Sequence, residues 1–245
     1  MPRAPKSPVL AHPHPVEAAP QVGVAVVPKP LRSDGLEARN RLLDAALVLF
    51  ADQGFAKTST RDIAQAAQAN LASIRYYFGD KAGLYRAIFN DPRTNPRGDP
   101  ALINVPGQSL ADALQVYLSE FILPLLNGLP SQSSMKLHFR EMLEPTGLWD
   151  AEINNHVRPA QEALVAVLCR HLGVTQADEH VYRLSFSIAG LGMVLHVGCD
   201  VIQLMQPQLI ATPAAIGRYG DYLVQAALAL VEAEARRRAA PAATS

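Results

Sequence analysis

The amino-acid sequence predicts an all-α protein with a small N-terminal helical domain and a larger C-terminal one. From Leu36 onward, apolar residues recur three and four positions apart, which is the spacing of one helix face. Val, Ile and Thr do not gather in alternating runs, so no strand is expected. The segment 91–107 contains four prolines and interrupts the helical pattern, which indicates a loop and a domain boundary.

Composition narrows the classes of function. The 245 residues include 22 Lys and Arg against 22 Asp and Glu, which excludes a globally basic nucleic-acid binder. Hydrophobic residues make up 49%, which argues against a largely disordered chain. Charge is nevertheless uneven, because residues 36–90 carry seven basic and five acidic side chains whereas residues 91–245 carry eleven and fifteen. This asymmetry points to an anionic partner at the N-terminal end.

Residues 1–35 read as a proline-rich arm ahead of the helical pattern. Eight prolines fall within residues 1–30, and the longest apolar run there has six residues, too few for a secretory signal. Proline-rich sequence without periodicity indicates a disordered segment. The basic residues of this arm fit a solvated tail, with contact to DNA as the alternative: Arg3, Lys6, Lys29 and Arg32.

Four helices are expected in the N-terminal domain, residues 36–90, at about 36–54, 58–67, 70–78 and 81–89. Gly54 stops the first helix, because a glycine readily takes the left-handed conformation at a helix end. Thr58 or Ser59 can cap the second helix with a side-chain oxygen, and Asn70 can cap the third. Two short helices joined by a tight link, following a longer one, predict a three-helix helix-turn-helix DNA-binding domain.

Five longer helices are expected in the C-terminal domain, residues 108–238, near 109–127, 133–144, 150–171, 177–205 and 213–238. The last two are more apolar than one amphipathic face requires, and no Lys or Arg lies between Arg183 and Arg218. The apolar run 184–199 has 16 residues and falls short of the ~20 that span a bilayer. The two helices are therefore expected to form a homodimer interface rather than a membrane span.

The third helix carries side chains typical of DNA contact. Its Asn, Ser and Tyr side chains can bond phosphate oxygens or base edges, and Arg75 can make a bidentate contact with guanine. Lys57 and Arg61 fit either a phosphate contact or a solvated face. The expected DNA-binding residues are Thr58, Ser59, Thr60, Asn70, Leu71, Ala72, Ser73, Arg75, Tyr76, Tyr77 and Lys81.

Residues 38–89 resemble the DNA-binding domain of TetR/AcrR-type repressors. The shared patterns are A-x-x-L-F-x-x-x-G-F, T-[ST]-x-x-x-I-A and Y-x-F-x-x-K-x-x-L-Y, found here at 46–55, 58–64 and 76–85. The segments 140–146 and 73–79 resemble the CecR-like branch of that family. The sequence departs from the family at Arg75, where relatives often have Asn or Tyr, and at Gln68 and Ala69, where Gly-Val is usual, so the base preference of Arg75 is not carried over.

The resemblance implies a dimeric repressor that leaves a pseudo-palindromic operator on double-stranded DNA when a small apolar effector binds. The effector pocket is expected within 108–205. Polar anchors are expected there from His138, Arg140, Glu141, Glu144 and Trp149, because these polar groups lie in a largely apolar helical domain. Pairing of the charged residues with one another is the alternative.

Other classes of function have less support in the sequence. No G-x-G-x-x-G, G-x-S-x-G, H-E-x-x-H or P-loop motif is present, so neither an enzyme nor a cofactor is expected. Cys169 and Cys199 lack a C-x-x-C partner motif and fit a reducing cytoplasm, and packing is favoured over metal binding for His196 with Cys199. A ligand-independent activator or architectural DNA binder is the main alternative, and a helical enzyme is a more remote one.

Overall fold

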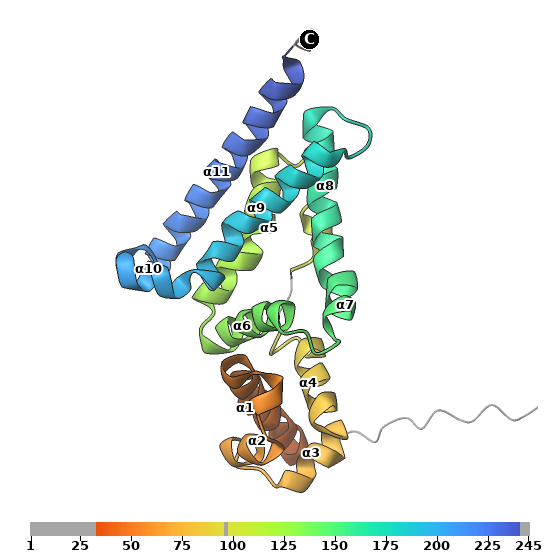
Figure 1. Ribbon diagram of the computed structural model, residues 1–245, viewed down its shortest axis with the longest axis vertical. Coiled ribbons are helices and arrows are strands. Elements are labelled where there is room, and N and C mark those ends of the chain that lie inside the picture. Colours follow the sequence, from red (N-terminus) through yellow and green to blue (C-terminus); the bar gives the residue numbers. More distant parts are fainter. Residues whose placement is uncertain (1–32, 96–97, 241–245) are drawn as a thin grey trace, which may run out of the picture.

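The computed structural model describes residues 33–95 and 98–240, which form two groups of helices stacked along one long axis (Figure 1). The proline-rich arm up to residue 32 lies outside the described residues. Ser33 to Gly35, assigned to that arm from the sequence, instead form the first turn of α1 (Ser33–Lys57). Asp34 in that first turn stabilises it, because a carboxylate interacts favourably with the positive end of the helix dipole.

Helices α1 to α4 form the lower group, which we call the head. They are α1, α2 (Thr60–Ala66), α3 (Leu71–Phe78) and α4 (Lys81–Asn90). The hydroxyl of Ser59 accepts from the Asp62 amide at 3.1 Å, and the Asn70 side chain accepts from the Ala72 amide at 2.9 Å. Of the two candidates for the second helix, Ser59 is the cap, and Asn70 caps the third helix as predicted, so these residues set the starts of the two short helices.

Gly54 bends α1 rather than ending it. Its backbone has φ of 81° and ψ of 165°, outside the helical region, and one further turn follows to Lys57. The site is crowded, because a Cβ at this position would lie 3.0 Å from Nη1 of Arg140. Glycine is therefore required here both for its positive φ and for the approach of that guanidinium.

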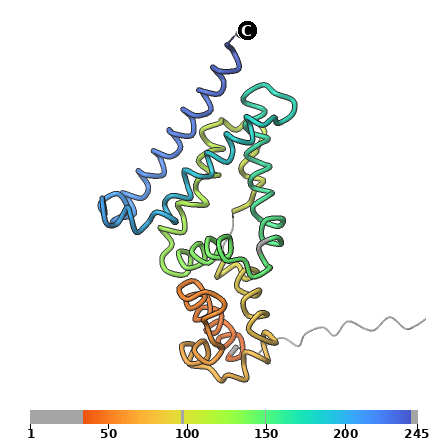
Figure 2. Tube along the Cα trace, viewed as in Figure 1, coloured from red at the N-terminus to blue at the C-terminus, as the bar shows by residue number. Residues whose placement is uncertain are grey.

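The upper group contains the remaining elements. Its α-helices are α5 (Leu110–Leu126), α6 (Leu129–Leu143), α7 (Trp149–Glu152), α8 (Arg158–Leu172), α9 (Glu179–Val197), α10 (Cys199–Met205) and α11 (Pro213–Ala239). Two short 3₁₀ helices, η1 (Pro100–Leu102) and η3 (Pro207–Leu209), and the π-helical segment η2 (Ile153–Val157) between α7 and α8 complete it. Helices α5, α8, α9 and α11 enclose an apolar core that includes Leu114, Leu168, Ile188 and Ala227. Figure 2 shows α6 crossing between this core and the head.

Two of the predicted C-terminal elements differ from the structure. The helix expected at 133–144 begins earlier, at Leu129, because Pro130 occupies the first turn, where proline is favourable. The single helix expected at 177–205 is two helices, α9 and α10, that meet at 64°. The break falls at Gly198, where a Cβ would lie 2.9 Å from the carbonyl oxygen of Val194.

The described helices offer no single membrane span. None of them alone is long and apolar enough to cross a bilayer, and only the bent pair of α9 and α10 passes by length and composition.

Helix α6, although part of the upper group, also packs against the head. Its Leu137 is 1% exposed and packs in the apolar cluster of the head, together with Leu47, Phe50 and Ile88. Apart from this residue and the adjoining Leu148, the head cluster consists of residues from α1 to α4. Helix α6 thus inserts one side chain of the upper group into the core of the lower one.

Candidate DNA-binding surface and inter-domain joint

Helix α3 lies at the end of the head that is farthest from the upper helices (Figure 1). Its apolar Ile74 is buried, while Arg75 is exposed and its guanidinium makes no hydrogen bond or ion pair within the described part of the chain. Tyr76 is 75% exposed, and its ring meets that of Tyr77 edge to face at 4.8 Å. The predicted DNA contacts that lie wholly or partly at the surface of this end are Ser59, Thr60, Asn70, Leu71, Ala72, Ser73, Arg75, Tyr76, Tyr77 and Lys81.

Thr58 does not belong to this surface. It is 1% exposed, and its hydroxyl donates to the carbonyl oxygens of Gly54 at 2.8 Å and Leu49 at 3.1 Å. Its side chain therefore closes the end of α1, and we drop it from the set of DNA contacts. Lys81 is partly buried and holds its ammonium 4.4 Å from the centre of the Phe55 ring, so its charge stays beside the aromatic core of the head.

The turn between α2 and α3 contains a strained residue. Gln68 has φ of 49°, and it is the one non-glycine residue with positive φ among those that the structure describes. Just before it, the Ala67 carbonyl accepts from Nε of Arg41 at 3.2 Å. Gln68 stands where a glycine is usual in this turn. It still adopts the left-handed conformation, which is strained for a residue that has a Cβ.

Helix α6 meets the head in a set of polar contacts that we call the joint, formed by Lys136, Arg140 and Glu141 with α1 and α4. Arg140 donates to the carbonyl oxygens of Ala51 at 3.3 Å and Asp52 at 3.2 Å, immediately before the Gly54 bend. Lys136 forms an ion pair with the Asp52 carboxylate at 2.8 Å. The last carbonyls of the straight part of α1 are thus bonded by a side chain from the upper group.

Glu141 lies inside the joint and is 0% exposed. Its carboxylate accepts from the Tyr85 hydroxyl at 2.7 Å, from the Thr146 amide at 2.7 Å and hydroxyl at 3.0 Å, and from the Leu148 amide at 3.3 Å. Burial, and then the neighbouring Glu141, raise the pKa of the Tyr85 phenol above its ordinary value, so Tyr85 remains a donor. These donors compensate the cost of burying a carboxylate.

The other residues expected to anchor an effector lie at or near the same joint. His138 has its Nδ1 2.8 Å from the Ser134 carbonyl oxygen and its Nε2 2.8 Å from the Glu152 carboxylate. Glu144 is 69% exposed and pairs with Arg140 at 3.1 Å. Trp149 starts α7, but its side chain lies outside the described part of the structure. Because Arg140 and Glu141 are occupied by head contacts, we do not retain them as effector anchors.

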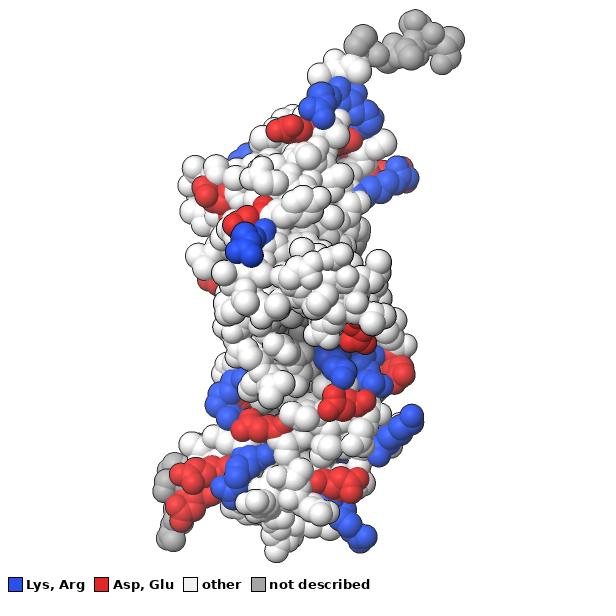
Figure 3. Space-filling model, turned by 90° about the vertical axis from the view of Figure 1, so that its left-hand side faces the viewer, with Lys and Arg blue, Asp and Glu red and all other residues white. Residues whose placement is uncertain are grey.

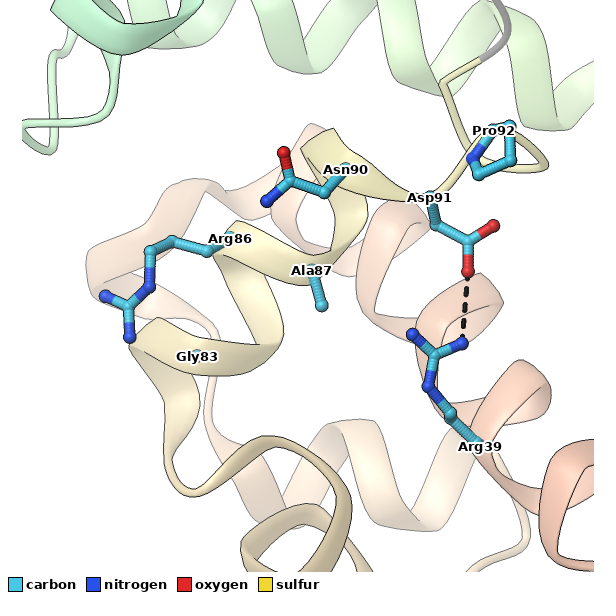
Figure 4. A pocket seen from close by; sticks show the side chains of 7 residues that line it. All are labelled: Arg39, Gly83, Arg86, Ala87, Asn90, Asp91 and Pro92. Carbon is cyan, nitrogen blue, oxygen red and sulfur yellow. Dashed lines mark hydrogen bonds and ion pairs between the residues drawn. The ribbon is translucent and has the colours of Figure 1, made fainter. Parts of the chain in front are cut away.

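A hollow of about 460 Å³ opens between α1 and α4 (Figure 4). In Figure 4, Arg39 of α1 turns toward Asp91, with which it pairs at 3.1 Å, while Arg86 of α4 points away from that pair. Among the predicted effector anchors whose side chains the structure describes, none lines this hollow. A second hollow of about 720 Å³ lies beside Tyr182 and Phe186 on α9, and none of those described anchors lines that one either.

Helices α9, α10 and α11 carry many of the large apolar residues that are exposed in the upper group. In Figure 3 the middle of the face toward α10 carries few charged side chains. Leu204 is 86% exposed and Phe186 is 63% exposed, values far above those of core residues. The large apolar side chains exposed on these helices are Tyr182, Phe186, Val194, Val197, Val201, Leu204, Met205, Tyr222 and Leu230.

Sequence reasoning missed a polar chain inside the upper core. The Tyr117 hydroxyl of α5 donates to Oε1 of Gln161 at 2.8 Å, and the amide of Gln161 donates to the Ser185 hydroxyl at 2.9 Å. Tyr117 is 5% exposed and Ser185 is fully buried. The available signal was a tyrosine at a position that the helix period assigns to the core, because a buried phenol needs a partner. The same signal marks Tyr85 in the joint.

Two family models match the chain. The one described as "Bacterial regulatory proteins, tetR family" matches residues 42–88. The one described as "HTH-type transcriptional dual regulator CecR, C-terminal domain" matches residues 110–233, about half of the chain. The first match spans most of the head, and the second spans α5 to α10 and most of α11.

The chain is also similar to individual transcriptional regulators, in sequence and in structure. The transcriptional dual regulator CecR of Shigella flexneri is 27% identical over 180 residues, which cover 69% of this chain and 80% of CecR. The uncharacterised regulator YvkB of Bacillus subtilis is 29% identical over 187 residues, covering 72% and 93%. NalD, the secondary repressor of a multidrug efflux pump in Pseudomonas aeruginosa, superposes with a TM-score of 0.59 at 20% identity, covering 80% and 96%. A SmeT–triclosan complex superposes with a TM-score of 0.55 at 18% identity, covering 78% and 90%, so both structures support the fold alone.

Proposed function

Because the chain belongs to the TetR family of transcriptional regulators, we propose that it is an effector-responsive repressor that binds a pseudo-palindromic operator as a homodimer. The observation that carries this proposal is the capped helix α3, which presents Arg75 and Tyr76 at the outer end of the head. An exposed arginine on a short helix can enter the major groove and bond guanine. The rest of the chain then has to pair two such heads and respond to an effector.

Different residues along α3 suit contact with the DNA bases and with the DNA phosphates. Asn70 and Ser73 at its start and Arg75 in its middle are the candidates for base edges. Tyr76, Tyr77 and Lys81 follow at its end and at the start of α4, where they suit phosphate contact. The head carries a small basic excess, which favours association with a polyanion.

The apolar face of α9 and α11 supports the homodimer. Arg183 and Arg218 bound a stretch without any cationic residue, and exposed Phe186 and Tyr222 lie on this face. Burying such a face between two copies removes apolar surface from water, and a two-fold axis makes the two contributions identical. The domain division follows: residues 36–90 bind the operator, and residues 108–238 bind the effector and form the dimer.

The effector is proposed to lie between α5, α8 and α9, beside the Tyr117–Gln161–Ser185 chain. The groups of this chain are uncharged and sit in an apolar core, which suits a neutral, largely apolar compound with one or two polar atoms. Farther along α9, three turns beyond Ser185, His196 stacks on Phe139 of α6 with ring centres 5.7 Å apart. Helix α6 therefore contacts α9, which borders the proposed effector region, as well as the head across the joint.

Activation at some promoters is a second candidate function. The observation that favours it is the similarity to CecR, which is described as a dual regulator. A regulator of that kind uses the same head and dimer, and the position of the operator relative to the promoter decides the sign of its effect.

Transcription in a purified system distinguishes these functions. The wild-type protein first selects its DNA sequence from random duplexes, and that sequence is then placed over a promoter. We expect the protein to lower transcript yield, and a panel of neutral apolar compounds that starts with triclosan to contain one that restores it. Raised yield from a promoter with the site upstream favours the activator, and absence of any compound effect at saturation contradicts the effector part of the proposal.

A further inference from the structure

We propose that Glu141 is a positioning residue for DNA binding, which fixes the head on the C-terminal domain and thereby sets the distance between the two heads of a dimer. This inference rests on the proposed function, because it assumes two heads on one operator. The observation behind it is that the buried carboxylate of Glu141, on α6 of the upper group, accepts a hydrogen bond from Tyr85 in the core of the head.

The contact is directional on both sides. Tyr85 is 2% exposed and packs edge to face against Phe50 and Phe89, with ring centres 4.9 Å and 5.3 Å apart, so the phenol itself cannot turn. On the other side, the Thr146 and Leu148 amides hold the carboxylate of Glu141 from the loop after α6. An apolar contact such as that of Leu137 permits sliding, whereas these hydrogen bonds favour one orientation of α6 on α4.

The chain connection does not fix that orientation by itself. Helix α4 ends at Asn90 and α5 begins at Leu110, so no helix runs continuously from the head into the upper group. The orientation therefore depends on packing across the joint. Arg140, bonded to the carbonyls of Ala51 and Asp52, adds a second attachment on α1, so α6 holds the head at two of its helices.

Head orientation matters only when two heads must bind together. Half-sites of a palindromic operator lie about one helical turn apart. Once the first head is bound, the second reaches its half-site at full affinity only if the spacing of the two heads matches the spacing of the half-sites. A loosened joint lets each head bind one half-site as before but weakens the gain from binding both. The expected signature is a selective loss on the complete operator.

The test compares the complete selected operator with DNA that carries one half-site. The variants are Tyr85→Phe, which removes one hydroxyl, and Glu141→Gln, which removes the charge at constant shape, together with the double variant. Glu179→Gln is the control, because Glu179 forms an exposed ion pair with Arg183 far from the joint. Thermal unfolding by circular dichroism identifies any variant whose head has lost its structure.

We expect Tyr85→Phe and Glu141→Gln to weaken binding to the complete operator about tenfold, within the usual range of coupling between sites, and to change half-site binding less than about twofold. The double variant should be no weaker than the worse single one, because both remove the same bond. One base pair inserted between the half-sites should weaken the wild type more than either variant.

Two results would overturn the inference. Equal losses on complete and half-site DNA would mean that the bond stabilises the head alone. Unchanged binding to both DNAs, with unchanged spacer dependence, would mean that the head is positioned without Glu141. A wild-type protein that selects no sequence at all would instead overturn the proposed function, and this inference with it.

Discussion

Nε of Arg41 donates to the carbonyl oxygen of Ala67 at 3.2 Å, which ties α1 to the turn of the helix-turn-helix. The next residue, Gln68, takes the left-handed conformation with φ of 49°. The bond holds the end of α2 while the chain reverses, so the turn keeps its shape even though a glutamine occupies the position that most needs a glycine.

Replacing Gln68 with glycine should therefore stabilise the protein. We expect Gln68→Gly to raise the free energy of unfolding by about 0.5–1 kcal/mol, because relief of left-handed strain exceeds the added entropy of the unfolded chain. Urea unfolding measures the change. Gln115→Gly, at an exposed position inside α5, is the matched control and should lower stability by about 1 kcal/mol. A loss of stability for both variants would contradict the strain argument.

Arg75 and Lys81 should separate base reading from phosphate contact. Arg75→Ala should cost about 1–3 kcal/mol on the selected operator and little on random DNA, because a base-edge contact carries sequence information. Lys81→Ala should weaken binding to both DNAs and lower the slope of log affinity against log salt by about one. Titrations at several salt concentrations on both DNAs measure this. Equal losses for Arg75→Ala on the two DNAs would make Arg75 a phosphate contact.

The sequence predicted those parts of the fold that depend on local chemistry. A polar side chain ahead of an apolar helical period predicts a cap at Thr58 or Ser59 and another at Asn70, and the structure has caps at Ser59 and Asn70. The bend at Gly198 was missed, because the residues around it, such as Val197 and Val201, continue an apolar pattern through the break. Helix periodicity identifies buried faces, but it carries no information about the angle between successive helices.

The sequence predicted the exposed surface of α3 better than the joint, because the joint depends on how helices pack together. Exposed positions on α3 follow from its helix period, so Arg75 and Tyr76 could be placed from the sequence. Thr58 could not, because its burial depends on the bend at Gly54 that turns its hydroxyl toward α1. Glu141 read as a polar anchor in an apolar domain, whereas its partner Tyr85 lies 56 residues away. That pairing depends on how two groups of helices dock, which one sequence does not specify.

Acidification should destabilise the C-terminal domain through His196. Burial lowers the pKa of this imidazole by more than the hydrogen bond from its Nε2 to the Phe121 carbonyl, at 2.8 Å, raises it, so the folded protein favours the neutral ring. The unfolded chain binds a proton near pH 6.5, above the folded pKa, so stability is fully present above about pH 6.5 and falls as the pH is lowered through that value. Thermal unfolding between pH 5 and pH 8 measures the slope.

A substitution that cannot titrate should remove this slope. His196→Gln is expected to flatten the dependence of melting temperature on pH, while His180→Gln, at an exposed position on the same helix, should leave it unchanged. The same slope in wild type and His196→Gln would show that another group causes the acid sensitivity.

The dimer face should be sensitive to a single charge. Phe186→Glu places a carboxylate in the proposed contact, where burial without a partner is unfavourable, so the protein should become a monomer in sedimentation experiments. Val157→Glu introduces the same charge on η2, on the side of the molecule opposite α10 (Figure 1), and should leave the dimer intact. A dimer that survives Phe186→Glu with undiminished affinity would place the interface elsewhere.

A footprint on genomic DNA tests the central claim most directly. The wild-type protein is used to capture fragments from a genomic library, and the captured sites are mapped by nuclease protection at a known ratio of protein to DNA. The account predicts two protected half-sites related by two-fold symmetry, about one helical turn apart, and filled together by two chains. Protection without sequence preference, or of a single asymmetric site by one chain, would contradict it.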